Sequence, residues 1–136
     1  MKIAISSKGN NLDSELDPRF GRCKYFLFVD TENMDFEAVS NESIMATGGA
    51  GIKAAETVAN KGVNSVITGN IGPNAFRTLN AAEIKVFTGA SGSIKEVIEK
   101  YKNNKLDEAL NPTAASHSGM RWIIWKFVSQ QMEITD

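Results

Sequence analysis

The chain of 136 residues has few of the side chains from which most metal centres are built, with one cysteine, Cys23, and one histidine, His117. A single cysteine cannot close an intramolecular disulfide, which suits a reducing compartment, and we expect a cytoplasmic protein. Four-ligand zinc and iron–sulfur sites need more Cys and His side chains than this chain carries. Any metal site must therefore use carboxylates, share ligands between subunits, or hold a cluster that arrives already assembled.

The sequence also lacks an excess of charge and long apolar runs. With 15 basic and 16 acidic residues the formal net charge is −1, which argues against nucleic acid as the main partner. No stretch is long enough to cross a bilayer, so we expect no membrane partner. The apolar start at residues 2–6 is too short for a signal peptide and indicates a buried first strand.

What the chain does contain is the alternating pattern of an α/β protein, with ordinary hydrophobic content for one domain. Strands are predicted at residues 2–6, 24–29, 36–40, 63–68 and 84–88. Helical patterns precede a stop at Gly62, begin near Pro73, and follow Ser93, which has Glu96 as its capping-box partner. Strands alternating with helices imply parallel crossovers. Together these strand and helix patterns predict a three-layer α/β/α domain whose mixed five-stranded sheet has one antiparallel strand.

A phrase of the form T-G-x-x-G occurs three times, about twenty residues apart, beginning at Thr47, Thr68 and Thr88. Turns between strands and helices gather along one edge of an open α/β sheet, where such folds bind ligands. Glycine lets the backbone approach a ligand, and the helix N-termini behind it present N–H groups to anions. Alternatively, these glycines only supply unusual dihedrals in tight turns. The candidate binding residues from this repeat are Gly48, Gly49, Gly51, Thr68, Gly69, Asn70, Gly72, Thr88 and Gly89.

A long polar loop at residues 7–22 ends beside two arginines, and connections of this length are often functional. Arg19 and Arg22 could hold an anionic cluster or a phosphate through charge-assisted hydrogen bonds. Equally, either could pair with a carboxylate of the same loop, namely Asp13, Glu15 or Asp17. Asp17 precedes Pro18 and is most simply a turn residue, so it receives no chemical role.

Two side chains are candidate metal ligands. Cys23 lies among cationic neighbours, which lower the pKa of a thiol and favour the thiolate that binds metal. Its alternative is a small buried residue at the start of a strand. His117 lies in a polar segment, where it is either a metal ligand or a solvated loop residue.

The C-terminal residues 119–136 form a separate apolar segment that contains Trp122 and Trp125. It is too short for a membrane span and too apolar to stay exposed. We expect a short helix over residues 121–131 that buries both tryptophans against the domain or in an oligomer such as a homodimer.

The stretch of residues 17–30, which contains Asp17-Pro18-Arg19-Phe20-Gly21-Arg22-Cys23, resembles the signature loop and strand of the dinitrogenase iron–molybdenum cofactor biosynthesis family, whose members are nitrogenase accessory factor-like. Residues 48–51, 68–75 and 86–89 are similar to the same family in the same order, so the resemblance covers a domain of residues 1–118. It implies a ribonuclease-H-like fold and the binding of an iron–sulfur-type cluster, or of an iron–molybdenum cofactor precursor, rather than catalysis. The binding residues expected in the loop are Arg19, Phe20, Gly21, Arg22 and Cys23.

The sequence offers little for an enzyme, because it has no GxSxG motif and no P-loop lysine after its glycines. The first hypothesis, which the resemblance implies and the scarcity of ligands favours, is a non-catalytic carrier of a metallocluster that exchanges it with donor and acceptor proteins. A small-anion or nucleotide-binding module acting at the glycine-rich sheet edge is the alternative. A third is an interacting subunit whose apolar C-terminus docks on a larger partner.

Overall fold

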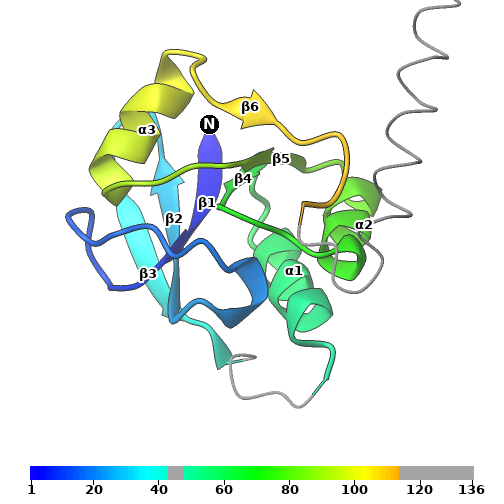
Figure 1. Ribbon diagram of the computed structural model, residues 1–136. Helices are drawn as coiled ribbons and strands as arrows, with labels where there is room; N and C mark the ends of the chain where they lie inside the picture. Colours follow the sequence, from blue (N-terminus) through cyan, green and yellow to red (C-terminus); the bar gives the residue numbers. More distant parts are fainter. Residues whose placement is uncertain (43–47, 114–136) are drawn as a thin grey trace, which may run out of the picture.

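The computed structural model describes residues 1–42 and 48–113, and Figure 1 shows how their helices and strands are arranged. Several expectations lie outside these described residues. They are the candidate ligand His117, the first residue of the first T-G-x-x-G copy, Thr47, the domain boundary at residue 118, and the helix predicted over residues 121–131.

The described residues form an open mixed sheet of six strands in the order β3-β2-β1-β4-β5-β6. These strands are β1 (Lys2–Ser7), β2 (Tyr25–Asp30), β3 (Phe36–Ser40), β4 (Ser65–Ile67), β5 (Lys85–Thr88) and β6 (Asp107–Glu108). Strands β1, β4 and β5 are parallel to one another, whereas β2 and β6 run antiparallel to their neighbours β1 and β5.

The prediction of five strands with one antiparallel strand is therefore wrong. The missed strand β6 contains two charged residues, which give no apolar signal, and it forms through backbone pairing with Phe87 and Thr88. The five expected strands are present, and the hairpin of β2 and β3 has the expected antiparallel register.

Helices lie on both faces of this sheet, which gives three layers (Figure 1). The helices are α1 (Ala50–Asn60), α2 (Pro73–Ala81) and α3 (Ile94–Lys102). Figure 1 shows α1 and α2 together on one side and α3 on the other. The ribonuclease-H-like class, which is a finer statement than this layering, stays a prediction.

Two hydrophobic clusters separate the layers because successive strand residues point to opposite faces. In β1, Ala4 belongs to the cluster beneath α1 and α2, while Ile3 and Ile5 belong to the cluster beneath α3. The apolar faces predicted for the helices supply the other walls, with Val58 of α1 on one side and Ile98 of α3 on the other. The sheet is therefore covered on both faces.

The helix ends follow the signals in the sequence. Pro73 is the first residue of α2, where its missing N–H costs nothing. The Ser93 hydroxyl caps α3 by accepting the Glu96 N–H at 3.2 Å. Gly62, which follows α1, adopts a left-handed φ of 69°. No helix in the described part of the chain is both long and apolar enough to cross a membrane.

Candidate functional site: a pocket between two helix N-termini and an arginine loop

A pocket of about 350 Å³ lies where three segments meet beyond the carboxyl end of β4. One wall is the segment of residues 19–22, called here the arginine loop, which contains the short 3-10 helix η1 (Phe20–Arg22). The other walls are the starts of α1 and α2. The residues that line it are Arg19, Phe20, Gly21, Arg22, Gly49, Ala50, Gly51, Ile52, Asn70, Gly72, Pro73, Asn74 and Ala75. The structure therefore brings together eight of the residues predicted to bind a ligand: Arg19, Phe20, Gly21, Arg22, Gly49, Gly51, Asn70 and Gly72.

Backbone pairing holds the arginine loop against the turn that precedes α2. The Asn70 N–H donates to the Pro18 carbonyl at 2.6 Å, and the Phe20 N–H donates to the Asn70 carbonyl at 3.3 Å. Arg19 and Asn70 thus form a parallel bridge outside the main sheet. The buried Phe20 ring, packed on Phe26 at 5.2 Å between centroids, anchors the loop in the core.

Small residues bring the loop, α1 and α2 into close contact. A Cβ on Gly21 would lie 3.0 Å from the Gly51 Cα, and a Cβ on Gly51 would lie 3.4 Å from the Ala75 Cβ. Glycine at position 21 is what allows the loop to approach α1 so closely, whereas a Cβ on Gly51 would make only an ordinary van der Waals contact with α2.

The lining of the pocket is suited to anions. Arg19 and Arg22 supply positive charge, and the starts of α1 and α2 supply N–H groups that have no partner within their own helices. The residues before these helices, Gly49 and Gly72, carry no side chain that could cap those groups. The arrangement can bind oxygen or sulfur atoms of an anion from several directions.

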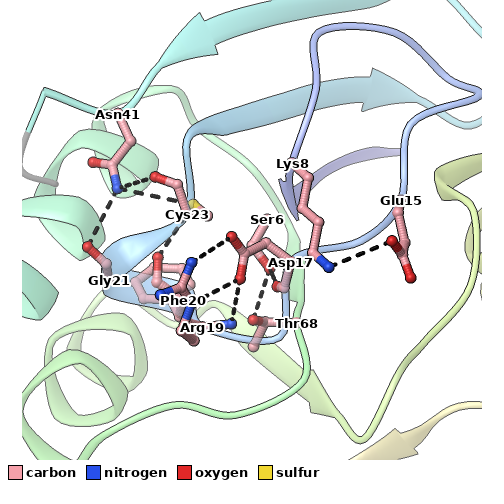
Figure 2. A network of polar contacts seen from close by, with 10 residues as sticks. All are labelled: Ser6, Lys8, Glu15, Asp17, Arg19, Phe20, Gly21, Cys23, Asn41 and Thr68. Atoms are coloured by element: carbon pink, nitrogen blue, oxygen red, sulfur yellow. Dashed lines mark hydrogen bonds and ion pairs between the residues drawn. The ribbon is translucent and has the colours of Figure 1, made fainter.

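One arginine of the pocket is held by a buried carboxylate, as Figure 2 shows. The Arg19 Nε lies 3.3 Å from Asp17 Oδ1, and its Nη2 lies 3.3 Å from Asp17 Oδ2. The hydrogen bond and negative charge of Asp17 raise the pKa of Arg19. Of the three carboxylates in the loop, only Asp17 is buried. The sequence indicated only a turn residue at Asp17, and its contact with Arg19 is a role that the turn pattern did not reveal.

Two predicted binding residues lie beneath the pocket instead of lining it. Thr68 is fully buried, and its hydroxyl is 2.7 Å from the Ser6 hydroxyl, which itself contacts the Asp17 carbonyl (Figure 2). Gly69 packs on Pro18, whose Cα would lie 2.6 Å from a Cβ at that position. Both residues hold the loop in place and are not among the residues exposed to the pocket.

The third T-G-x-x-G copy lies beside the second, since the Gly89 N–H donates to the Gly69 carbonyl at 2.9 Å, but it does not line the pocket. Thr88 and Gly89 lead into α3, which lies on the opposite face of the sheet from α1 and α2, and neither lines the pocket. Gly48, in the first copy, is exposed and also outside the lining. That all three copies form one working edge stays a prediction. Since α3 packs on the opposite face of the sheet from α1 and α2, the pocket between those two helices includes residues of the first two copies only.

The environment of Cys23 is the reverse of the one expected from its neighbours. The thiol is fully buried, donates to the Phe20 carbonyl at 3.3 Å, and lies 3.8 Å from the Asn41 amide nitrogen. Burial, together with the negative charge of Asp17, raises the pKa of Cys23 to about 12. The neutral thiol is favoured, as in the alternative of a small buried residue at a strand start, and Cys23 is not part of the pocket lining.

Metal-ligating side chains do not cluster in residues 1–42 and 48–113, which contain no group of three His, Cys, Asp or Glu side chains able to hold a metal ion. The pairing of Cys23 with His117 as metal ligands stays a prediction, since His117 lies outside the described residues.

The sequence of this chain matches the family model of the dinitrogenase iron-molybdenum cofactor family over residues 1–104. The chain belongs to this family. The resemblance inferred from residues 17–30, 48–51, 68–75 and 86–89 is confirmed by this match.

Relatives of this family share most of the chain. An uncharacterized protein of Methanocaldococcus jannaschii is 35% identical over 111 residues, or 79% of this chain and 91% of that protein. The solved apo form of the orange protein from Desulfovibrio gigas is 37% identical, with a TM-score of 0.80, and the match covers 82% of this chain and 95% of the other. A putative NifB protein from Thermotoga is 38% identical with a TM-score of 0.70, covering 79% and 91% of the two chains.

Proposed function

We propose that this family member is a non-catalytic carrier that binds an anionic iron–sulfur-type metallocluster, such as the iron–molybdenum cofactor or its precursor. The supporting observation is the pocket itself, which gathers two arginines and the first turns of two helices in a chain of the iron-molybdenum cofactor family. The negatively charged outer atoms of such a cluster can accept hydrogen bonds from guanidinium and backbone N–H groups.

The way the cluster is held would suit a carrier. No trio of metal-ligating side chains is present in the described ranges, so the cluster would be held there mainly through its outer atoms. Hydrogen bonds break and form more readily than several metal–thiolate bonds, which allows release to an acceptor protein. Cluster donor and acceptor proteins are accordingly the partners that this proposal requires.

The lining also supports a non-catalytic role. The residues of the described chain that line the pocket include no His, Cys, Ser, Asp or Glu, so a nucleophile beside a general base is not formed there. Arginine side chains bind anions through their fork of N–H groups and do not serve as proton-transfer groups, so the two arginines of the pocket suit binding.

The second candidate is a small-anion or nucleotide-binding module. It is favoured by the pocket volume of about 350 Å³, near the lower end of the range of small-molecule sites, and by backbone donors that suit phosphate oxygens. The two candidates share the same residues and differ in the ligand.

Anaerobic reconstitution separates them. The protein would be incubated with iron and sulfide, or with a preformed iron–sulfur anion capped by small thiols, and then desalted and analysed for bound metal and visible absorbance. A carrier retains metal in stoichiometric amounts with charge-transfer bands, and inorganic phosphate or ATP competes weakly. Retention of phosphate or ATP with no retention of metal would favour the binding module instead.

The Arg22→Ala variant links the result to the pocket. Because Arg22 lines the pocket and is exposed, its loss should weaken retention with little change in thermal stability. Lys53→Ala is the matched control, since Lys53 is an exposed cation of α1 outside the lining. Equal retention of metal by wild type, Arg22→Ala and Lys53→Ala would show that the ligand binds outside this pocket.

A further inference from the structure

The carboxylate of Asp17 occupies an unusual position for a loop residue. Its side chain is only 4% exposed, whereas the side chain of its partner Arg19 is 67% exposed. A buried charge is costly unless it is paired and hydrogen-bonded, and Arg19 supplies that pairing. The surface loop therefore keeps a buried carboxylate directly behind a residue of the pocket.

The contacts between the two side chains are directional. Asp17 Oδ1 accepts from the Arg19 backbone N–H at 3.0 Å and from Nε at 3.3 Å, while Oδ2 accepts from Nη2 at 3.3 Å. This two-pronged contact fixes the plane of the guanidinium in a way that a single contact does not. Among residues 1–42 and 48–113 the Nη1 edge makes no hydrogen bond, so its donors can serve another acceptor, since an arginine has five N–H groups in all.

The backbone of Asp17 is itself held in place by two hydrogen bonds to Ser6. Its backbone N–H donates to the Ser6 carbonyl at 3.0 Å, and its carbonyl accepts from the Ser6 hydroxyl at 2.6 Å (Figure 2). Ser6 belongs to β1, in the middle of the sheet. Asp17 thus fixes the position of the Arg19 guanidinium relative to the sheet, although Arg19 lies in a loop.

From these contacts we propose that Asp17 is a positioning residue that presents the free edge of the Arg19 guanidinium to the anion in the pocket. The inference rests on the proposed function in that the pocket takes an anionic ligand. Holding a flexible cation in its binding geometry before the ligand arrives reduces the entropy that binding must offset. The carboxylate acts through Arg19 and does not touch the ligand.

The negative charge of Asp17 has a second effect on anion binding, which acts in the opposite direction. Removing the negative charge of Asp17 would make the pocket more positive and, by charge alone, strengthen anion binding. Arg19 is well exposed, so this effect is screened by solvent and salt. We therefore expect loss of orientation to outweigh the gain in charge, most clearly at high ionic strength.

The test is a double-mutant cycle with Asp17→Asn, Arg19→Ala and the combination, using as probe a preformed iron–sulfur anion capped by small thiols. Asp17→Asn keeps an acceptor for the Arg19 backbone N–H but places an amide where Oδ2 accepted from Nη2. We expect it to weaken binding about tenfold, the size of one charge-assisted hydrogen bond. In the Arg19→Ala background the same change should have almost no effect, because there is no guanidinium left to position.

Two further variants keep the test decisive. Arg19→Lys retains the positive charge but cannot form the two-pronged contact, and it should weaken binding about as much as Asp17→Asn, roughly tenfold. Asp13→Asn removes a charge from the same loop, but Asp13 is 85% exposed and pairs with Lys95, so its effect on binding should be below twofold.

The possible results fall into distinct groups. Binding by Asp17→Asn as tight as that of wild type or tighter would overturn the inference, as would an equal loss in the Arg19→Ala background. Wild type that binds inorganic phosphate and not the cluster would overturn the carrier function, and the same cycle would then be measured with phosphate. Wild type that binds neither probe would overturn both proposals. Nitrogen-15 NMR of ligand-free protein gives an independent reading, because the Arg19 Nη2 hydrogens should be protected from exchange in wild type and lose protection in Asp17→Asn, which removes their acceptor Oδ2.

Discussion

Gly21 and Gly51 lie so close together that a Cβ built on Gly21 would come within 3.0 Å of the Gly51 Cα and 3.1 Å of its nitrogen. The two glycines come from different walls of the pocket, one from the arginine loop and the other from the first turn of α1. Their contact sets the spacing of those walls, and therefore the width available to a ligand.

Gly21→Ala should consequently force the loop and α1 apart. Both atoms that the new methyl group would meet are backbone atoms, which cannot rotate away. We expect a loss of about 1–3 kcal/mol in the free energy of unfolding, the usual cost of overpacking, measured by urea denaturation. Gly48→Ala is the control, since a Cβ there meets nothing within 4 Å, and it should change stability by less than about 0.5 kcal/mol. Equal stability of both variants would show that the loop adjusts without cost.

Gly69 and Gly89 occupy equivalent places in two T-G-x-x-G copies, but their substitutions should differ in cost. A Cβ at Gly69 would lie 2.6 Å from both the Cα and the Cβ of Pro18, whereas at Gly89 there is open space. Gly89→Ala should cost about 1 kcal/mol, because the φ of 77° disfavours a side chain. Gly69→Ala should cost more and should also disturb the pocket loop. Thermal unfolding of the two variants checks the order, and the reverse order would contradict it.

Cys23 should make the fold less stable in alkali. Because its pKa is raised to about 12 in the folded protein, the unfolded chain loses the thiol proton first as pH rises above 9. The folded state then binds more protons than the unfolded state, so the free energy of unfolding falls as pH rises, by up to about 1.4 kcal/mol per pH unit. This contribution is fully present below pH 9 and is lost on the way to pH 12.

The measurement is urea denaturation of wild type and Cys23→Ala between pH 8 and about pH 10.5. The variant has no thiol to titrate, so its stability should fall less steeply, whatever its stability at neutral pH. Parallel pH dependences would show that the thiol titrates alike in the folded and unfolded chains.

Thr113 should stabilise the turn that carries Asn70 and Gly72. Its hydroxyl oxygen accepts the Ile71 N–H at 3.0 Å, and its own N–H donates to the Ile71 carbonyl at 3.0 Å. Thr113→Val keeps the shape and removes the acceptor, so we expect a loss of about 1 kcal/mol and faster hydrogen exchange at the Ile71 amide. Thr57→Val is the control, because the Thr57 hydroxyl donates to a carbonyl within α1. Unchanged exchange at Ile71 would contradict the role of Thr113.

Much of the fold could be predicted from the sequence because hydrophobic periodicity records burial directly. The apolar run of β2, the stripe on α3 and the capping pair of Ser93 and Glu96 all lie where the pattern places them. Strand β6 could not be predicted in this way, since Asp107 and Glu108 are exposed and contribute through their backbone alone.

The candidate site was predictable in part. Glycines and arginines at the expected positions line one pocket, because the turns after parallel strands share an edge of the sheet. The opposite placement of α3 removed Thr88 and Gly89 from that pocket, and the burial of Cys23 reversed the expectation for its thiol. Neither the face on which a helix packs nor the depth of a side chain is encoded in local spacing.

The sequence by itself determined the alternation of strands and helices, the scarcity of soft metal ligands and the membership of a family, because these depend on residue types and their order. Only the tertiary structure decided which carboxylate holds Arg19. Asp13, Glu15 and Asp17 all precede Arg19 in the same loop, but Asp17 alone is drawn against β1 by two hydrogen bonds to Ser6 and thereby buried behind the pocket. Burial depends on contacts between segments far apart in the sequence, and those contacts exist only once the chain has folded.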